Sequence, residues 1–367
     1  MLWRLSMSML MAILLVDNVA AQVQISGVDR GFQNGTTVTI DGLGFGTKAF
    51  PAPRLWDDLN SPAYDGFGHG DVFPTRDGDN DHPQDSNAPQ KDAGYSESSL
   101  ASVLDSGNAR VDGRYVYAFR SNQGGAIKEL GDVGGDFLMV DWWIYSDAIM
   151  SINPGTTKLG RFWAGSAGTA GRITIYPERI KWDAYPDESY GYGSWFVDGV
   201  WNHYRLLVDS SGGLGPNGGH GTIKFYWNNT LVASGSDLSW TVGVSGGPNY
   251  TWAETIQAWD YHNSSPHVGP TYVSDIYLDN SQARVVLGDA STWSQVQHYE
   301  LQIPQDWQPQ SIQVTGNLGS FTPGESVWLY VVDANGNLNE NGLAVETDLG
   351  PPPEGPGQPG QPITSGS

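Results

Sequence analysis

Two segments of this sequence place aromatic rings and hydrogen-bonding side chains at alternate positions, the spacing that puts them on one face of a β-strand. A Trp or Tyr ring can stack on a sugar ring, and a neighbouring carboxylate or amide can bond the sugar hydroxyls. The segments are FLMVDWWIY (137–145) and TIQAWDYH (255–262). They predict a glycan-binding face made of Asp141, Trp143, Tyr145, Gln257, Trp259 and Tyr261.

The assignment of side chains to the glycan-binding face has alternatives. In the second segment, a shift of one residue in register would turn the other alternate set outward, with Asp260 and His262. It also stays open that these rings only pack beneath long loops. In the first segment the other set is apolar and is the natural core set: Leu138, Val140, Trp142 and Ile144.

A second group of residues would fit the cleavage of an acidic polysaccharide by elimination. Such a lyase needs a base and an acid, often His and Tyr, beside a cation that neutralises the uronate carboxylate. His203 and Arg205 project from one side of WNHYRLLVD (201–209), and Tyr204 projects from the other. The motifs of alginate lyases do not occur, nor does the Glu-x-Asp-x-x-Glu pattern of laminarinase-type hydrolases. The sequence therefore favours a protein without catalysis but leaves the question open.

Three carboxylates alternate in RDGDNDH (76–82), as oxygen ligands do in calcium loops. They are Asp77, Asp79 and Asp81. An EF-hand is excluded, because it needs Gly where His82 stands and Glu where Ala88 stands. A looser Ca²⁺ site and a solvated acidic loop are the two remaining interpretations. Calcium is the one cofactor that the sequence suggests.

The composition excludes several function classes. The chain has no Cys, so neither disulfides nor thiolate chemistry is available. Its 40 acidic and 18 basic residues give a net charge of −22, and without clusters of Lys and Arg we expect no nucleic-acid partner. No Gly-x-Ser-x-Gly nucleophile elbow occurs. The segment GLGFG (42–46) lacks the glycine spacing and the following helix of a dinucleotide-binding loop.

The elements that must position these residues are β-strands. Runs of β-branched and aromatic residues recur between Gly, Asn and Pro, and no convincing amphipathic helix is longer than about ten residues. In FYWNNTLV (225–232), Asn228 and Asn229 separate two such runs and tolerate the positive φ of a tight hairpin. Many short strands without alternating helices predict an all-β fold of antiparallel sandwiches.

Two resemblances refine that fold class. The segments WNHYRLLVD (201–209) and GTIKFYWNNTLV (221–232) resemble the paired strands of concanavalin A-like jelly rolls, the fold of legume lectins and laminarinases, over a pattern from Leu55 to Asp279. VQISGVDRGFQNGTTVTIDGLGFGTK (23–48) resembles the first half of an immunoglobulin-like IPT/TIG domain. The segment 310–345 resembles its second half. These resemblances imply a jelly roll inserted into a split small sandwich.

Burial gives an independent reason to join the two halves. A strand pair of about 25 residues cannot cover both of its faces, so each terminal hairpin needs partners. The alternative is two separate elements that each pack on the jelly roll. The predicted organisation is a signal peptide (1–21), the first half of the IPT-like domain (22–50), the jelly roll (51–284), the second half of the IPT-like domain (285–348) and a disordered Pro/Gly-rich tail (349–367).

The beginning of the chain predicts export. Arg4 precedes an apolar run (10–16), and small residues follow at 19–21, which is the layout of a secretory signal peptide. We therefore expect a secreted or cell-surface protein that is not inserted in a membrane after cleavage. With GFGTK (44–48) early and LYVVDANG (329–336) late, the chain also resembles secreted bacterial proteins over nearly its whole length. That likeness implies an architecture but no activity.

The function predicted from these features is recognition of a polysaccharide on an aromatic concave face. One alternative is a carbohydrate-cleaving enzyme, in the first place a polysaccharide lyase. The other is a structural subunit of an extracellular fibre or coat, whose partner would be a second copy of the chain.

Overall fold

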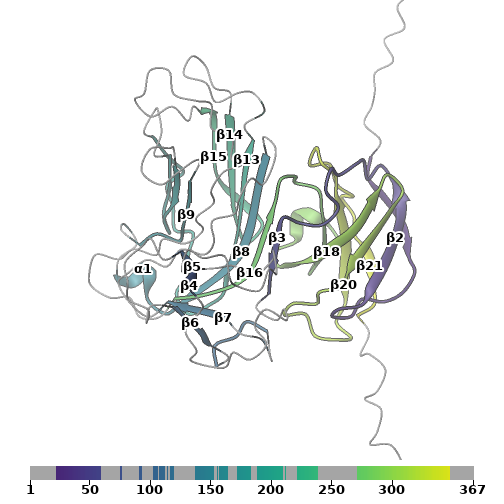
Figure 1. The fold of residues 1–367 in the computed structure, drawn as a ribbon, viewed down its shortest axis with the longest axis horizontal. Coiled ribbons are helices and arrows are strands. Elements are labelled where there is room, and N and C mark those ends of the chain that lie inside the picture. Colours follow the sequence, from purple (N-terminus) through teal and green to yellow (C-terminus); the bar gives the residue numbers. More distant parts are fainter. Residues whose placement is uncertain are drawn as a thin grey trace, which may run out of the picture.

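Two β-sandwiches lie side by side in a computed structural model of the chain, joined by two adjacent connections (Figure 1). The all-β fold class is confirmed, because strands make up nearly all regular structure among the described residues, beside α1 (Ile149–Ile152) and the 3₁₀ helix η2 (Trp293–Gln295). The structure describes residues 22–58, 75–76, 91–92, 102–105, 107–111, 114, 116–119, 137–152, 155, 157–163, 172–182, 188–209, 211, 221–238 and 271–347.

The larger sandwich is built on an eight-stranded antiparallel sheet in which β8 (Phe137–Ser146) lies between β13 (Asn202–Asp209) and β16 (Thr271–Asp279). Strand β8 is long enough to pair with β13 over eight residues without interruption, from Phe137 to Ile144. Along the sheet the strands are β15 (Thr230–Leu238), β14 (Gly221–Trp227), β13 (Asn202–Asp209), β8 (Phe137–Ser146), β16 (Thr271–Asp279), β7 (Val116–Phe119) and β6 (Ser102–Asp105), with β3 (Leu55–Asp57) on β16.

A four-stranded sheet covers one face of this sheet and closes the larger sandwich. Side chains at alternate positions of β8 point toward it, as the sequence predicted: Leu138, Val140, Trp142 and Ile144 are all buried in one apolar core. The four-stranded sheet comprises β12 (Glu188–Tyr190), β11 (Ile180–Trp182), β10 (Arg172–Ile175) and β9 (Gly160–Trp163), and β4 (Thr75–Arg76) and β5 (Lys91–Asp92) form a separate parallel pair.

Strands from both ends of the described chain make the smaller sandwich. A single seven-stranded antiparallel sheet folds around its own apolar core. The long strand β18 (Tyr299–Gln308) makes this possible, because its first part, up to Gln302, pairs with β17 and its second part, from Ile303 on, pairs with β19. In order the strands are β1 (Gln24–Val28), β2 (Thr37–Leu43), β19 (Ser311–Thr315), β18 (Tyr299–Gln308), β17 (Arg284–Gly288), β20 (Val327–Val332) and β21 (Leu343–Val345).

The incomplete N-terminal hairpin thus has its partner in the C-terminal part of the chain. Strand β2 pairs with β19 over five residues, from Thr37 opposite Thr315 to Asp41 opposite Ser311. The predicted signal peptide (1–21) and tail (349–367) lie outside the described residues. The predicted start of the second half, at 285, is one residue inside β17.

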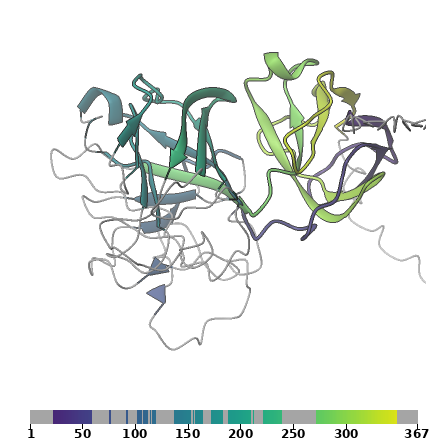
Figure 2. The same cartoon turned by 90° about the horizontal axis from the view of Figure 1, so that it is seen from above.

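The two connections between the sandwiches run beside each other (Figure 2). Lys48 in the first and Asp279 at the start of the second form an ion pair of 2.6 Å, and both side chains are fully buried. Lys48 also donates to the carbonyl of Pro51. A buried pair of this kind fixes two chain segments in one geometry, because either charge left alone would be strongly destabilising.

The hairpin between β14 and β15 has the predicted turn. Asn228 and Asn229 both adopt positive φ, 45° and 60°, which matches a two-residue turn of the kind that follows the twist of its strands. The tip of this hairpin lies at the smaller sandwich, because Asn229 donates to the carbonyl of Val296 at 3.0 Å. The hairpin therefore extends the contact between the sandwiches.

Candidate functional site

The second face of β8 lies against the smaller sandwich. Met139, Leu207 and Tyr277 from the eight-stranded sheet pack with side chains of β17, β18 and β20 in a separate apolar cluster. The alternation in the sequence predicts an open concave surface on this face. The structure instead covers its middle, because β17, β18 and β20 also carry apolar side chains on both faces.

Asp141 lies in this contact, 1% exposed, with both carboxylate oxygens engaged. His203 Nε2 is 2.5 Å from its Oδ1, and the hydroxyl of Tyr299 donates to its Oδ2. Arg205 in turn donates from Nη1 to the Tyr299 oxygen at 2.8 Å. Burial raises the pKa of Tyr299 above its usual range, so the phenol keeps its proton and acts as the donor. Asp141 therefore joins the two sandwiches.

The three residues considered for lyase chemistry are all buried. His203 and Arg205 point to the contact between the sandwiches, whereas Tyr204 points into the core of the larger sandwich and donates to the carbonyl of Trp195. Burial raises the pKa of Tyr204 well above its ordinary value. A catalytic acid or base must come within hydrogen-bonding reach of the substrate. In this arrangement the three side chains position other groups.

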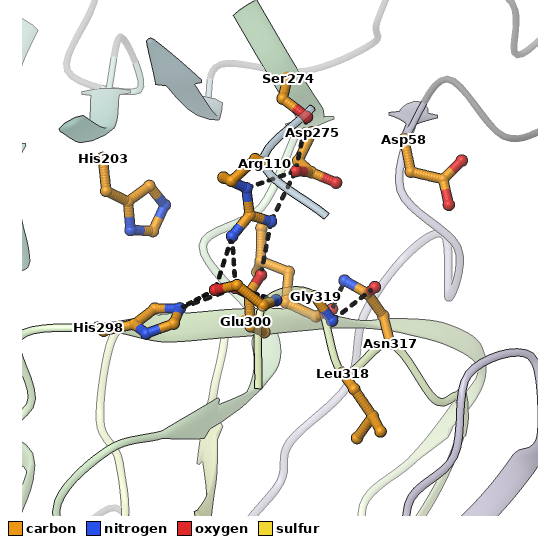
Figure 3. A network of polar contacts seen from close by, with 12 residues as sticks. Asp58, Arg110, His203, Ser274, Asp275, His298, Glu300, Asn317, Leu318 and Gly319 are labelled. Carbon is orange, nitrogen blue, oxygen red and sulfur yellow. Dashed lines mark hydrogen bonds and ion pairs between the residues drawn. The ribbon is translucent and has the colours of Figure 1, made fainter. Parts of the chain in front are cut away.

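A second polar cluster lies at the edge of the same contact and centres on Arg110 (Figure 3). Its guanidinium bridges Asp275 on β16 and Glu300 on β18, with contacts of 2.6 Å and 2.5 Å. Arg114 adds a parallel link, because it contacts Asp275 at 3.2 Å and Asn317 of the smaller sandwich at 3.0 Å. These charges tie one sandwich to the other.

Local backbone irregularities aim the two carboxylates at Arg110. A bulge in β16 between Ser274 and Tyr277 gives Asp275 a φ of 51°, which turns its carboxylate out of the regular alternation. Glu300 lies against the backbone of Gly319, where an added Cβ would be 2.0 Å from the Glu300 carboxyl carbon. Glycine is therefore required there, and the Ser320 N–H donates to Glu300 at 3.0 Å.

The electrostatics of this cluster are those of a closed ion-pair network. Burial alone would raise the pKa of Glu300, but the charge of Arg110 and the hydrogen bond from His298 outweigh it and hold the pKa below its ordinary value. Burial would lower the pKa of Arg110, and the charges of Asp275 and Glu300 raise it instead. Arg110 and Glu300 are therefore both charged near neutral pH.

A cleft of about 390 Å³ opens where this contact meets solvent. We call it the junction cleft. Among the described residues, three aromatic rings and five polar side chains line it, and their acceptors and amide donors suit a ligand rich in hydroxyls. The lining residues are Arg110, Trp143, Trp201, Asn228, Asp289, Gln297, His298 and Ser320.

Trp143 presents an edge to the junction cleft. His203 stacks on its ring, with centroids 4.1 Å apart and planes within 4°, and the Arg110 guanidinium carbon lies 4.4 Å from the ring centroid. Two groups this close occupy opposite faces of one indole. Trp201 is less covered, half-buried and 5.7 Å from the half-buried ring of Tyr145. Trp201 is thus the ring in the cleft that can offer a face to a sugar.

His298 cannot activate a nucleophile in this arrangement. Its Nε2 lies 2.7 Å from Glu300 Oε1 and 3.2 Å from Ser320 Oγ. In a catalytic triad the carboxylate and the nucleophile sit on opposite nitrogens of the imidazole, so that one orients the ring while the other is deprotonated. Here both use one nitrogen. The ring is held between Phe321, stacked at 4.5 Å, and the edge contact with Trp143.

Of the six residues predicted to bind a glycan, three are described. Trp143 lines the junction cleft, Asp141 is buried beneath it, and Tyr145 lies next to Trp201 at its outer side. Gln257, Trp259 and Tyr261 lie outside the described residues, as do the carboxylates considered for calcium, Asp77, Asp79 and Asp81.

Most residues of the cleft were not predicted from the sequence. His298 and Glu300 alternate in HYE (298–300), and this spacing could have predicted that they share one face of a strand. No sequence pattern indicated the role of Arg110, because its partners Asp275 and Glu300 are 165 and 190 residues away. Among the described residues, no group of three or more His, Asp or Glu is arranged to hold a metal ion. The helices in the described part of the chain are too short to span a membrane.

No protein-family model matches the chain, and no curated protein matches it in sequence. Solved structures give partial likenesses. The botulinum neurotoxin type G receptor-binding domain has 10% identity and a TM-score of 0.28 over 64% of this chain and 68% of that one. The binding domain of paraclostridial mosquitocidal protein 1 has 8% identity and a TM-score of 0.31 over 66% of each chain.

The Trypanosoma rangeli sialidase has 15% identity and a TM-score of 0.26, over 46% of this chain and 27% of the enzyme. Values this low carry no argument about function. The all-β class stands on the strands of this chain.

Proposed function

We propose that the protein binds a carbohydrate in the junction cleft. The observation that carries the proposal is the lining of this cleft, which combines the accessible Trp201 ring with hydrogen-bonding side chains. Carbohydrate sites need both, since a sugar has apolar C–H faces and a rim of hydroxyls. A volume of about 390 Å³ fits a small ligand or one end of a longer chain.

The polar residues of the cleft are held in place before any ligand arrives. Asp289 accepts hydrogen bonds from the backbone N–H groups of Gln297 and His298, at 3.1 and 3.2 Å. The two sandwiches that form the walls are joined by the Arg110 network. A site fixed in this way loses little entropy when it binds.

The aromatic rings continue outside the cleft. Tyr145 lies 5.7 Å from Trp201 and 5.9 Å from Tyr272, measured between ring centroids, and all three are half-buried. A row of partly exposed rings on neighbouring strands supports a glycan chain that runs from the cleft along the end of β8 and β16. This arrangement favours an oligosaccharide over a single sugar.

The proposal can be tested with a panel of oligosaccharides, titrated calorimetrically against the full chain. Trp201→Ala should weaken binding about tenfold, because a stacked ring contributes about 0.5 to 1.5 kcal/mol beyond its buried area. Tyr192→Ala is the matched control, since Tyr192 is a 79% exposed aromatic residue that does not line the cleft. Equal affinities of the two variants, or no binding by the parent chain, would refute the proposal.

Several finer features belong to the same proposal and are supported by the sequence alone. They are export through residues 1–21, a Ca²⁺ site at Asp77, Asp79 and Asp81, and the likeness of the two sandwiches to concanavalin A-like and IPT/TIG domains. Calcium can be tested by thermal unfolding with Ca²⁺ and with a chelator. An unchanged melting temperature would speak against the site.

The alternatives from the sequence have less support. A lyase must neutralise the substrate carboxylate, and His203, Tyr204 and Arg205 are all at most 3% exposed. A release of unsaturated products from a uronate polymer would nevertheless show this activity. A structural subunit would self-associate in the absence of sugar, which sedimentation at increasing protein concentration would detect.

A further inference from the structure

The charge of the junction cleft restricts what it can hold, and Arg110 is the first reason. A guanidinium has five N–H donors. Nε donates to Asp275 at 2.8 Å, and Nη2 donates to Asp275 and Glu300 at 2.6 and 2.9 Å. Nη1 donates to Glu300 at 2.5 Å and to Ser320 at 3.3 Å. Every donor is engaged, so Arg110 has none for an acidic ligand.

Among the residues that the structure describes, His298 is the other basic residue that lines the cleft. Its Nε2 is committed to Glu300, whose side chain is 2% exposed. His298 therefore adds no free positive charge for a ligand.

Asp289 and the amides of the cleft favour hydroxyl groups instead. Each Asp289 oxygen accepts one backbone hydrogen bond and keeps a lone pair for a further donor. Asn228 and Gln297 can each donate and accept. A sugar hydroxyl satisfies such groups, whereas a carboxylate ligand would face Asp289 without a cation between them. The net charge of −22 opposes an anionic polymer as well.

We infer that the junction cleft selects uncharged glycans and rejects those that carry carboxylates, such as uronates and sialylated chains. This inference rests on the proposed function and specifies its ligand class. Selection arises because Arg110 is saturated by Asp275 and Glu300 while the Asp289 carboxylate remains open to the ligand.

The test compares pairs of ligands that differ only in charge. Neutral oligosaccharides that bind are titrated beside the same compounds oxidised at C6 to uronates, and beside the methyl esters of those uronates. We expect the neutral sugar and the ester to bind at least tenfold more tightly than the uronate at low salt, with the ratio falling as salt is raised.

The variant Asp289→Asn should lower the ratio of neutral-sugar affinity to uronate affinity, because it removes the negative charge and keeps an oxygen acceptor. The affinity for the uronate should rise at least threefold relative to the affinity for the neutral sugar. Asp41→Asn, at an exposed position on β2 in the smaller sandwich, is the matched control and should change neither. Equal or tighter binding of the uronate overturns the inference and leaves the cleft a glycan site. If no sugar binds, the proposed function itself fails.

Discussion

The two faces of β8 are stabilised in different ways. One face contributes Leu138, Val140, Trp142 and Ile144 to a core in which apolar side chains meet apolar side chains. The other face changes character along the strand. Met139 is in an apolar contact, Asp141 is in a buried hydrogen-bond network, Trp143 is at the cleft, and Tyr145 is partly open.

This difference shows where a binding site can form in a protein of this type. An apolar core excludes water, and its contacts are not directional, so it does not orient the polar groups of a ligand. The face of β8 that lies under the smaller sandwich is an apolar contact at Met139 and opens into the cleft near Trp143. The apolar contact therefore holds the residues of the cleft in position. The site therefore depends on the contact between the sandwiches.

The largest effect should come from the core face. Trp142→Ala removes a fully buried indole that lies within 6.2 Å of Phe162, Tyr204 and Phe225, and should cost about 5 kcal/mol of unfolding free energy. Tyr145→Ala, on the other face of the same strand, should cost about 1 kcal/mol. Urea denaturation measures both. Similar losses would mean that the two faces do not differ as described.

The next largest effect should come from the Arg110 network. Arg110→Met leaves the buried carboxylates of Asp275 and Glu300 without their cation and should cost about 3 kcal/mol. Arg30→Met is the control, because Arg30 pairs with Asp29 at an exposed site and should cost less than about 1 kcal/mol. If both variants denature alike, Arg110 is not what links the sandwiches.

Acid should weaken the same network. The pKa of Glu300 is lower in the folded chain than its ordinary 4.5, since Arg110 and His298 outweigh the effect of burial. Its contribution is therefore fully present above about pH 4.5 and is lost as the pH falls through the lower folded value. Glu300→Gln should cost about 1 to 3 kcal/mol at neutral pH and progressively less in acid. A difference from the parent that is constant with pH would contradict this.

The smallest effect on stability should come from the open end of the cleft. Trp201→Ala should change the unfolding free energy by about 1 kcal/mol or less, because the ring is only half-buried. Thermal unfolding beside the binding titration separates the two roles. A large loss of stability would show that Trp201 belongs to the folding core and not to a binding surface.

Much of the fold could be read from the sequence because its signals are local. The alternation in β8 assigned Leu138 and Trp142 to the core, and the pair Asn228 and Asn229 marked a tight hairpin. Each depends on a few neighbouring residues and on the two-residue period of a strand. The need of the N-terminal hairpin for partners followed from the same reasoning about burial.

The site was harder to predict because its partners are far apart in the chain. Asp141 was expected on an open face, and its carboxylate is covered by Tyr299, 158 residues further on. No period or spacing indicates such a contact. Trp143 was recognised as a candidate, but the coverage of its two faces by His203 and Arg110 required the packed structure.

The sequence by itself determined the class of fold, the two faces of β8 and the acidity of the chain. Strand periodicity depends only on neighbouring residues, and net charge is a sum over all residues, so neither requires the tertiary structure. The tertiary structure alone decided that one face of the eight-stranded sheet is covered, that Arg110 is saturated by two carboxylates, and that a cleft remains at the edge of that contact. The physical reason is that desolvation and pairing of charges depend on which distant surfaces meet.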